Sequence, residues 1–306
     1  MTNRIVVGID GSTGARSALL WAADECRVRQ RTLLVVHAPD STDAVLVASS
    51  GEPAIRALDQ LGERLLNEHA AAASARQPGV PVTTLLSHAA AADALVDLSA
   101  DTDLLVVGTH GRGGNLTSIL GSVSHRAAAH AHCPVAVVPE QLALRGGTLA
   151  PRIVVGVSAT VSGRHALEFA LDEARRRGAS LVAVRAWGEP DAALVDELDP
   201  AAVDRWKHRA GDQLRGDLAP LAALYPDVAI ERTVVAAEPA DALLAAGKNA
   251  VLVVVGCHHS DDRWSTRLGA VPAAILHRSA CPVVVVGQRH QAPVANGHGV
   301  LIAEFT

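Results

Sequence analysis

The sequence predicts an α/β fold in two tandem copies, each a parallel sheet with helices on both faces. Strand-length apolar runs alternate with longer segments of helical spacing, and this alternation indicates strands joined by crossovers, which makes them parallel. Runs such as Leu104–Val107 carry no polar alternation, as expected for strands that are buried on both faces. The whole succession occurs twice along the 306 residues.

The elements of the first copy follow from these patterns in order. The opening apolar run predicts a strand over 4–9, after which Ala18, Trp21, Ala22 and Cys26 recur at the spacing of a helix. The remaining segments follow the same two patterns. Strands are expected over 4–9, 32–37, 80–86, 103–107 and 134–138, and helices over 17–29, 53–75, 90–100 and 122–131.

One constant offset relates the two copies. Landmarks of the first copy return 148 residues later, which is hard to obtain by chance four times: Gly8 and Gly156, Asp93 and Asp241, Gly108 and Gly256, Cys133 and Cys281. The chain is therefore interpreted as a duplication. The predicted domains are 1–143 and 151–288, joined by a short connector. The tail, 289–306, is expected to be loose, with Val300–Ile302 as an alternative extra strand.

The strand order predicted for each five-stranded sheet is 3-2-1-4-5. In such sheets the order reverses between strands one and four, and ligands bind outside the carboxyl ends of the strands at that reversal. The loops after Ile9 and Val107 are therefore expected to lie side by side.

A glycine-rich loop follows the fourth strand. It runs from Gly108 through Arg112 to Gly121-Ser122, where a helix is expected to begin. Glycine permits positive φ and lets a ligand approach the backbone. The free N–H groups of the helix start, its dipole and the hydroxyls of Ser122 and Ser124 make an anion site suited to phosphates, and Arg112 would add a charged donor. Such loops also occur without a ligand, so the loop alone is a weak signal.

At this loop the sequence resembles the universal stress protein family. The family's ATP-binding pattern is a glycine, two residues, a glycine, nine residues and then Gly-Ser or Gly-Thr, and Gly108, Gly111 and Gly121-Ser122 fit it. Val6–Ser12 is similar to the family's first strand and its Asp-containing turn, and Cys133–Val138 to its last strand. The resemblance covers nearly the whole chain twice, as in tandem members of the actinobacterial or mycobacterial type. It implies Rossmann-like domains of the adenine nucleotide alpha hydrolase-like group.

The resemblance also implies ATP as the ligand. Asp10 would lie near the nucleotide, and Mg²⁺ or Mn²⁺ bridging the phosphates would lie near Ser122 or Asp10. The adenine would be contacted by Gly8, Ile9, Ala38 and Val107. The ribose and the α-phosphate would be contacted by Gly108, His110 and Gly111. The distal phosphates would be contacted by Gly121, Ser122, Val123 and Ser124.

Other interpretations of these residues stay open. Asp10 also fits a turn or N-cap residue, and His110 also fits an exposed loop residue. Three histidines and a cysteine lie close enough in sequence to suggest a metal site, although a helix end with cationic side chains is preferred. These residues are His125, His130, His132 and Cys133.

The second copy departs from the motif. Both flanking glycines are kept, but a carboxylate, a glycine and a hydroxyl are replaced: Asp10 by Ser158, Gly111 by His259, and Ser122 by Ala270. Each lost contact of this kind costs about 1–3 kcal/mol. The second copy is therefore expected to bind ATP weakly or not at all. The alternative is a different ligand site rebuilt around His259, Asp261 or Arg263.

The sequence favours a binding protein over an enzyme. It has no Walker A lysine motif, no kinase-like Asp loop and no Ser-His-Asp arrangement at strand ends, so a nucleotide-binding regulatory protein is expected. The alternatives are a slow ATPase, an ATP-dependent ligase or pyrophosphatase, and a nucleotide-independent dimerisation or scaffold module. A dinucleotide-binding oxidoreductase fits poorly because the first turn lacks Gly-x-Gly-x-x-Gly and because His37 and Ala38 end strand two.

Assembly and location follow from composition and from the strand edges. The net charge of −5 disfavours a nucleic-acid partner. Residues 1–4 lead straight into a strand without a signal-peptide pattern, no apolar run spans a bilayer, and the cysteines do not require disulfides, so a cytoplasmic protein is expected. The apolar last strands, 135–138 and 283–286, would pair antiparallel with each other, and the resemblance implies a homodimer of whole chains.

Overall fold

The computed structural model describes residues 3–38, 52–111, 120–141, 151–187, 200–257, 268–287 and 303–304. The chain divides into two compact units. Unit 1 comprises Met1–Arg145 with Arg289–Thr306, and unit 2 comprises Gly146–Gln288. Most of the predicted connector and most of the tail lie outside the described residues.

Unit 1 contains the predicted parallel sheet. Its five strands run in the order β3-β2-β1-β4-β5, which confirms the predicted order. Their bounds are β1 (Arg4–Ile9), β2 (Thr32–His37), β3 (Val82–Leu86), β4 (Leu104–Gly108) and β5 (Val135–Val138). A two-residue strand, β11 (Ala303–Glu304), pairs antiparallel with β3. The alternative strand predicted at Val300–Ile302 lies outside the described residues.

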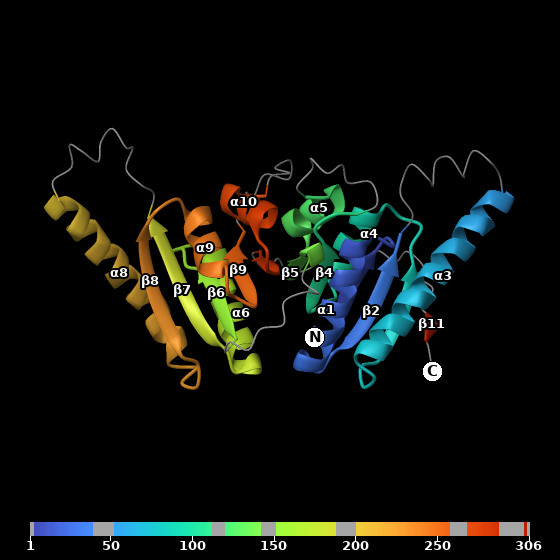
Figure 1. Ribbon diagram of the computed structural model, residues 1–306, viewed down its shortest axis with the longest axis horizontal. Helices are drawn as coiled ribbons and strands as arrows, with labels where there is room; N and C mark the ends of the chain where they lie inside the picture. The colour runs from blue at the N-terminus through green and yellow to red at the C-terminus, as the bar shows by residue number, and fades with distance from the viewer. Residues whose placement is uncertain are drawn as a thin grey trace. The chain divides into compact units, whose positions relative to one another are not determined.

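Two pairs of helices cover this sheet (Figure 1). The helices are α1 (Thr13–Arg29), α3 (Glu52–Arg76), α4 (Ala91–Ser99) and α5 (Ser122–His130). α1 and α3 pack together, and so do α4 and α5, which forms the three-layer arrangement predicted from the alternation. The core between the layers is aliphatic, with Ile5, Leu33 and Leu104 completely buried.

The start of α1 differs from its prediction. The helix begins at Thr13, four residues before the predicted start, because Ser12 caps it by accepting the Ala15 N–H at 3.1 Å. The helix ends at Arg29, and the C-cap residue Gln30 has the left-handed conformation with φ 56°. The early start brings the first turn of α1 to the carboxyl ends of β1 and β4, where the site is expected.

Unit 2 repeats the architecture. Its strand order is β8-β7-β6-β9-β10, again 3-2-1-4-5 in sequence terms. Its elements are β6 (Arg152–Gly156), α6 (Val161–Arg177), β7 (Ser180–Trp187), α8 (Pro200–Ala222), β8 (Ile230–Ala236), α9 (Pro239–Gly247), β9 (Leu252–Gly256), α10 (Ala270–Arg278) and β10 (Val283–Val286). Among the helices that the structure describes, none combines the length and the apolar character that a membrane span requires.

Candidate functional site

The loops after β1 and β4 meet at the carboxyl edge of the unit 1 sheet. β1 and β4 are hydrogen-bonded neighbours, with Val7 opposite Val106, so their ends lie together. The Ser12 hydroxyl donates to the carbonyl oxygen of His110 at 3.3 Å, which links the two loops directly. The loops after Ile9 and Val107 therefore lie side by side, as predicted.

Asp10 faces both loops. Its Oδ1 accepts the backbone N–H of Ser12 at 2.9 Å, the turn contact that the alternative interpretation expected. Its Oδ2 lies beside Gly111, so a Cβ added at Gly111 would clash with that oxygen. The half-buried carboxylate is thus held on its own turn and directed at the glycine-rich loop.

The N-terminus of α5 adjoins the same loops. Gly121 is the N-cap residue, and its N–H donates to the carbonyl oxygen of Thr109 at 2.8 Å. The first-turn amides that follow have no acceptor within the helix, no acidic residue lies in that turn, and Ser122 is exposed. These features suit an anion. Residues 112–119, including the predicted phosphate contact Arg112, lie outside the described residues.

Ser124 does not offer its hydroxyl proton to a ligand. The side chain is 5% exposed, and its Oγ donates to the carbonyl oxygen of Gly108 at 2.6 Å. The hydroxyl instead ties the first turn of α5 to the end of β4. The expectation that the Ser124 hydroxyl would donate to phosphate is corrected, and only its backbone amide stays available to an anion.

The described glycines of the β4 loop do not adopt positive φ. In unit 1 the described glycine with positive φ is Gly11, at 81°, whereas Gly121 has φ −68°. A Cβ on Gly108 would lie 2.7 Å from the carbonyl carbon of Gly14. The lack of a side chain at Gly108 therefore permits the close approach of α1 to β4, a role that the sequence did not predict for this glycine.

The residues expected around the adenine lie at the ends of β1, β2 and β4. Ile9 and Val107 are buried, while Gly8 and Ala38 are half-buried. His37 Nδ1 lies 2.9 Å from the carbonyl oxygen of Ile9, which already engages that atom. His110 is half-buried, with Nδ1 3.1 Å from the Thr109 hydroxyl.

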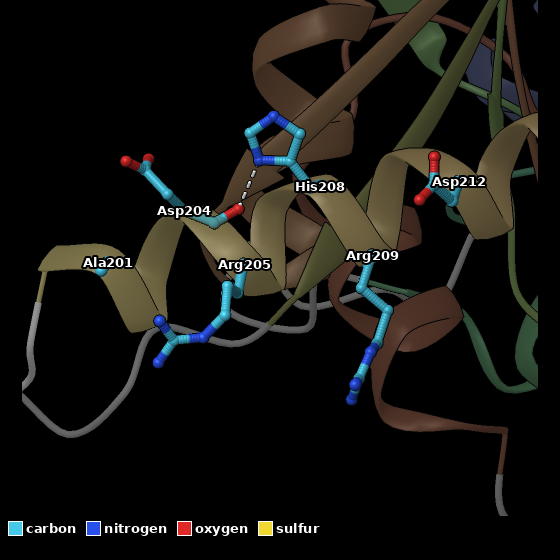
Figure 2. Close-up of a pocket in the computed structure, with 6 residues that line it drawn as sticks. All are labelled: Ala201, Asp204, Arg205, His208, Arg209 and Asp212. Atoms are coloured by element: carbon cyan, nitrogen blue, oxygen red, sulfur yellow. Dashed lines mark hydrogen bonds between the residues drawn. The ribbon is translucent and has the colours of Figure 1, made fainter.

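Two hollows formed by described residues lie away from these loops. The larger, about 570 Å³, is lined by exposed side chains of the single helix α8 (Figure 2): Ala201, Asp204, Arg205, His208, Arg209 and Asp212. The other, about 410 Å³, lies at the amino ends of the unit 1 strands, beside Asn3, Arg31 and Pro81. Neither is lined by a predicted nucleotide-binding residue.

The residues weighed as a metal site do not form one. Within the described ranges, no group of three or more His, Cys, Asp or Glu side chains lies close enough together to hold a metal ion. Burial raises the pKa of the Cys133 thiol to about 12, which keeps it protonated at neutral pH. Burial, then Arg126 and His125, lower the pKa of His130.

The equivalent turn of unit 2 is folded back on its own helix. Ser158, the counterpart of Asp10, has its Oγ 2.8 Å from the Thr160 hydroxyl and lies against Gly163 in the first turn of α6. α10 begins at Ala270, where unit 1 has the Ser122 hydroxyl. His259, Asp261 and Arg263 lie outside the described residues.

Unit 2 also contains a polar network that the sequence reasoning missed. Arg185 is 9% exposed, donates to Gln213 Oε1 at 3.0 Å and forms an ion pair with Asp217. Its Nε, like Nε1 of Trp187, is buried without a hydrogen-bond partner among the described residues. The signal was a lone arginine inside the apolar run of β7, and its partners on α8 are visible only in three dimensions.

Comparisons with known proteins agree with the duplicated fold. The family model described as "Universal stress protein family" matches residues 1–139 and 150–287. One universal stress protein of Mycobacterium tuberculosis is 32% identical over 289 residues, 93% of this chain and 97% of the relative. Another from the same species is 33% identical over 285 residues, 92% of this chain and 95% of the relative.

A solved structure resembles the chain over nearly its whole length. The crystal structure of a universal stress protein from Archaeoglobus fulgidus matches with a TM-score of 0.69 and 18% identity, covering 95% of this chain and 100% of that chain. At this identity the likeness shows the fold and leaves the ligand to be argued from the residues.

Proposed function

The chain belongs to the universal stress protein family, and we propose that it is a nucleotide-dependent regulatory protein of the stress response whose first unit holds ATP. One observation supports this most directly. The motif glycines, the Asp10 turn and the uncovered first turn of α5 come together at one edge of the unit 1 sheet. Fold and motif spacing therefore agree on the same place.

The triphosphate is proposed to lie over the start of α5. The amides of Ser122, Val123 and Ser124 and the exposed Ser122 hydroxyl would donate to its oxygens, and Arg112 would add charge. The ribose and α-phosphate would lie beside Gly108, His110 and Gly111, and Gly121 would lie with the α5 start beside the distal phosphates. Main-chain atoms of Gly8, Ile9, Ala38 and Val107 would border the adenine.

A divalent cation fits the charge of this site. Asp10 and the triphosphate are both anionic, so a Mg²⁺ or Mn²⁺ ion between them would offset their repulsion. The Asp10 carboxylate and the Ser122 hydroxyl are oxygen donors of the kind that Mg²⁺ prefers. When bound, the ion would neutralise phosphate charge.

Binding, rather than chemistry, is proposed as the activity. ATP bound at the loops after β1 and β4 would change the surface that the chain presents to a partner. Any hydrolysis would be slow, with turnover below about 1 s⁻¹, the low end for ordinary enzymes. Steady-state ATP turnover measured with and without Mg²⁺ distinguishes this proposal from the ATPase alternative.

The second unit is proposed to bind ATP weakly or not at all. The support is the hydroxyl contact of Ser158 with Thr160, together with the missing hydroxyl at Ala270. We further propose a cytoplasmic location. The last strands β5 and β10 would pair antiparallel, and whole chains would associate as homodimers. Light scattering at known concentration tests the homodimer.

The first experiment is mass spectrometry of nucleotide released from purified, denatured protein. The proposal predicts adenine nucleotide with the native chain and its loss with Asp10→Ala. If the native chain carries none and ATP added at millimolar concentration does not bind, a nucleotide-independent scaffold becomes the better account.

A further inference from the structure

Gly111 lies directly beside the Asp10 carboxylate, at the start of the glycine-rich loop after β4. An ideal Cβ built on Gly111 would clash with Asp10 Oδ2, well inside van der Waals contact. The other carboxylate oxygen is committed to the Ser12 N–H at 2.9 Å. Asp10 can keep this turn contact and its present position only while residue 111 has no side chain.

The duplicated chain supplies an internal comparison. Unit 2 has lost both members of the pair, since Ser158 replaces Asp10 and His259 replaces Gly111. The shorter Ser158 side chain points to Thr160 and Gly163 in its own helix start. Gly108 and Gly121, where the atoms nearest to an added Cβ do not include Asp10, are both kept as Gly256 and Gly269. In unit 2, therefore, the counterparts of both Gly111 and the Asp10 carboxylate are replaced.

We propose that Gly111 is a positioning residue for Asp10, and that the Asp10–Gly111 pair determines whether a unit of this chain can hold nucleotide. The binding half of this proposal rests on the proposed function. Any side chain at position 111 pushes the carboxylate off its place, because the short Asp10 side chain cannot rotate away and still accept from Ser12. The glycine acts through the aspartate rather than on the ligand itself.

The pairing is tested first without nucleotide, through the amide resonance of Ser12 in the full chain. The proteins compared are wild type, Gly111→Ala, Asp10→Ser and the double variant. Gly79→Ala is the control, because a Cβ there meets no atom within 4 Å. Gly111→Ala should move the Ser12 amide resonance towards the position that this resonance has in Asp10→Ser. In the double variant the Ser12 resonance should stay where it lies in Asp10→Ser alone. An unmoved Ser12 amide in Gly111→Ala overturns the pairing.

ATP titration of the same proteins tests the consequence. Gly111→Ala should weaken binding about tenfold or more when Asp10 is present, and less than about twofold when position 10 is serine. An equal loss in both backgrounds overturns the proposal, since Gly111 would then act on the ligand directly. If wild type binds no ATP, the proposed function fails, while the amide experiment still decides the pairing.

Discussion

Gly108 at the end of β4 and Gly14 in the first turn of α1 touch through their backbones. A Cβ at Gly108 would lie 2.7 Å from the Gly14 carbonyl carbon and 2.8 Å from its oxygen. Unit 2 repeats the contact, with a Cβ at Gly256 falling 2.8 Å from the same two atoms of Ser162. This close approach explains why the first motif glycine is kept in both units although Gly111 and Ser122 of the motif are replaced in unit 2.

Alanine at Gly108 or Gly256 is therefore expected to destabilise the fold. Backbone atoms cannot move aside as a side chain can, so each change should lower the free energy of unfolding by about 1–3 kcal/mol. Chemical denaturation measures it, with Gly79→Ala unchanged or stabilised by up to about 1 kcal/mol. An unaltered stability in Gly108→Ala would show that the contact is looser than described.

Two serines in the first turn of α5 should separate stability from binding. Ser124→Ala removes the donor to the Gly108 carbonyl and should cost about 1–3 kcal/mol of unfolding free energy. Ser122→Ala removes an exposed hydroxyl, so stability should change by less than about 0.5 kcal/mol while ATP binds about tenfold more weakly. Thermal unfolding and calorimetric titration of both variants check this, and the reverse pattern would contradict it.

The buried Arg185 should make Asp217 important for the stability of unit 2. Asp217→Ala leaves the guanidinium buried without its ion-pair partner and should cost about 3 kcal/mol, the low end for buried pairs because Asp217 is 38% exposed. Adding Arg185→Met should recover part of this loss. Asp212→Ala, which breaks the exposed pair with Arg215 on the same helix, is the control and should cost less than about 1 kcal/mol. Equal losses for the two aspartates would refute the network's role.

The buried thiols predict a pH dependence of stability. Burial raises the pKa of Cys26 and of Cys133 from the ordinary 9.0 to about 12. Between pH 9 and 12 the unfolded thiols ionise while the folded ones stay protonated, so the unfolding free energy should fall by about 1.4 kcal/mol per pH unit per thiol. Denaturation at several pH values should show a flatter profile for Cys26→Ala/Cys133→Ala, and identical profiles would contradict this.

Apolar runs were enough to locate the elements. Strands buried on both faces leave uninterrupted runs, so the predicted bounds of β1 and β2 match the observed ones. The 148-residue offset gives the starts of their unit 2 counterparts, Arg152 and Ser180. α1 began earlier than predicted because its first turn carries polar Thr13 and is set by the Ser12 cap. The pattern of apolar residues was therefore sufficient to predict the elements whose position is determined by burial of their own side chains.

The detailed roles at the site could not be predicted from the sequence. That Gly108 accommodates α1, and that the Ser124 hydroxyl binds the β4 end, depends on which distant segments meet there. The partners of Arg185 lie about one helix further along the chain for the same reason. The motif spacing predicted a candidate site, while tertiary contacts show that Gly108 and Ser124 of that site also serve the fold.

The central claim is that one unit of the pair holds ATP. Isothermal titration of the full chain with ATP and Mg²⁺, after removal of co-purified nucleotide, measures it most directly through the stoichiometry. The account predicts one ATP per chain, with binding weakened by Asp10→Ala and by Ser122→Ala. Two equivalent ATP molecules per chain, or a single site unaffected by both substitutions, would contradict it.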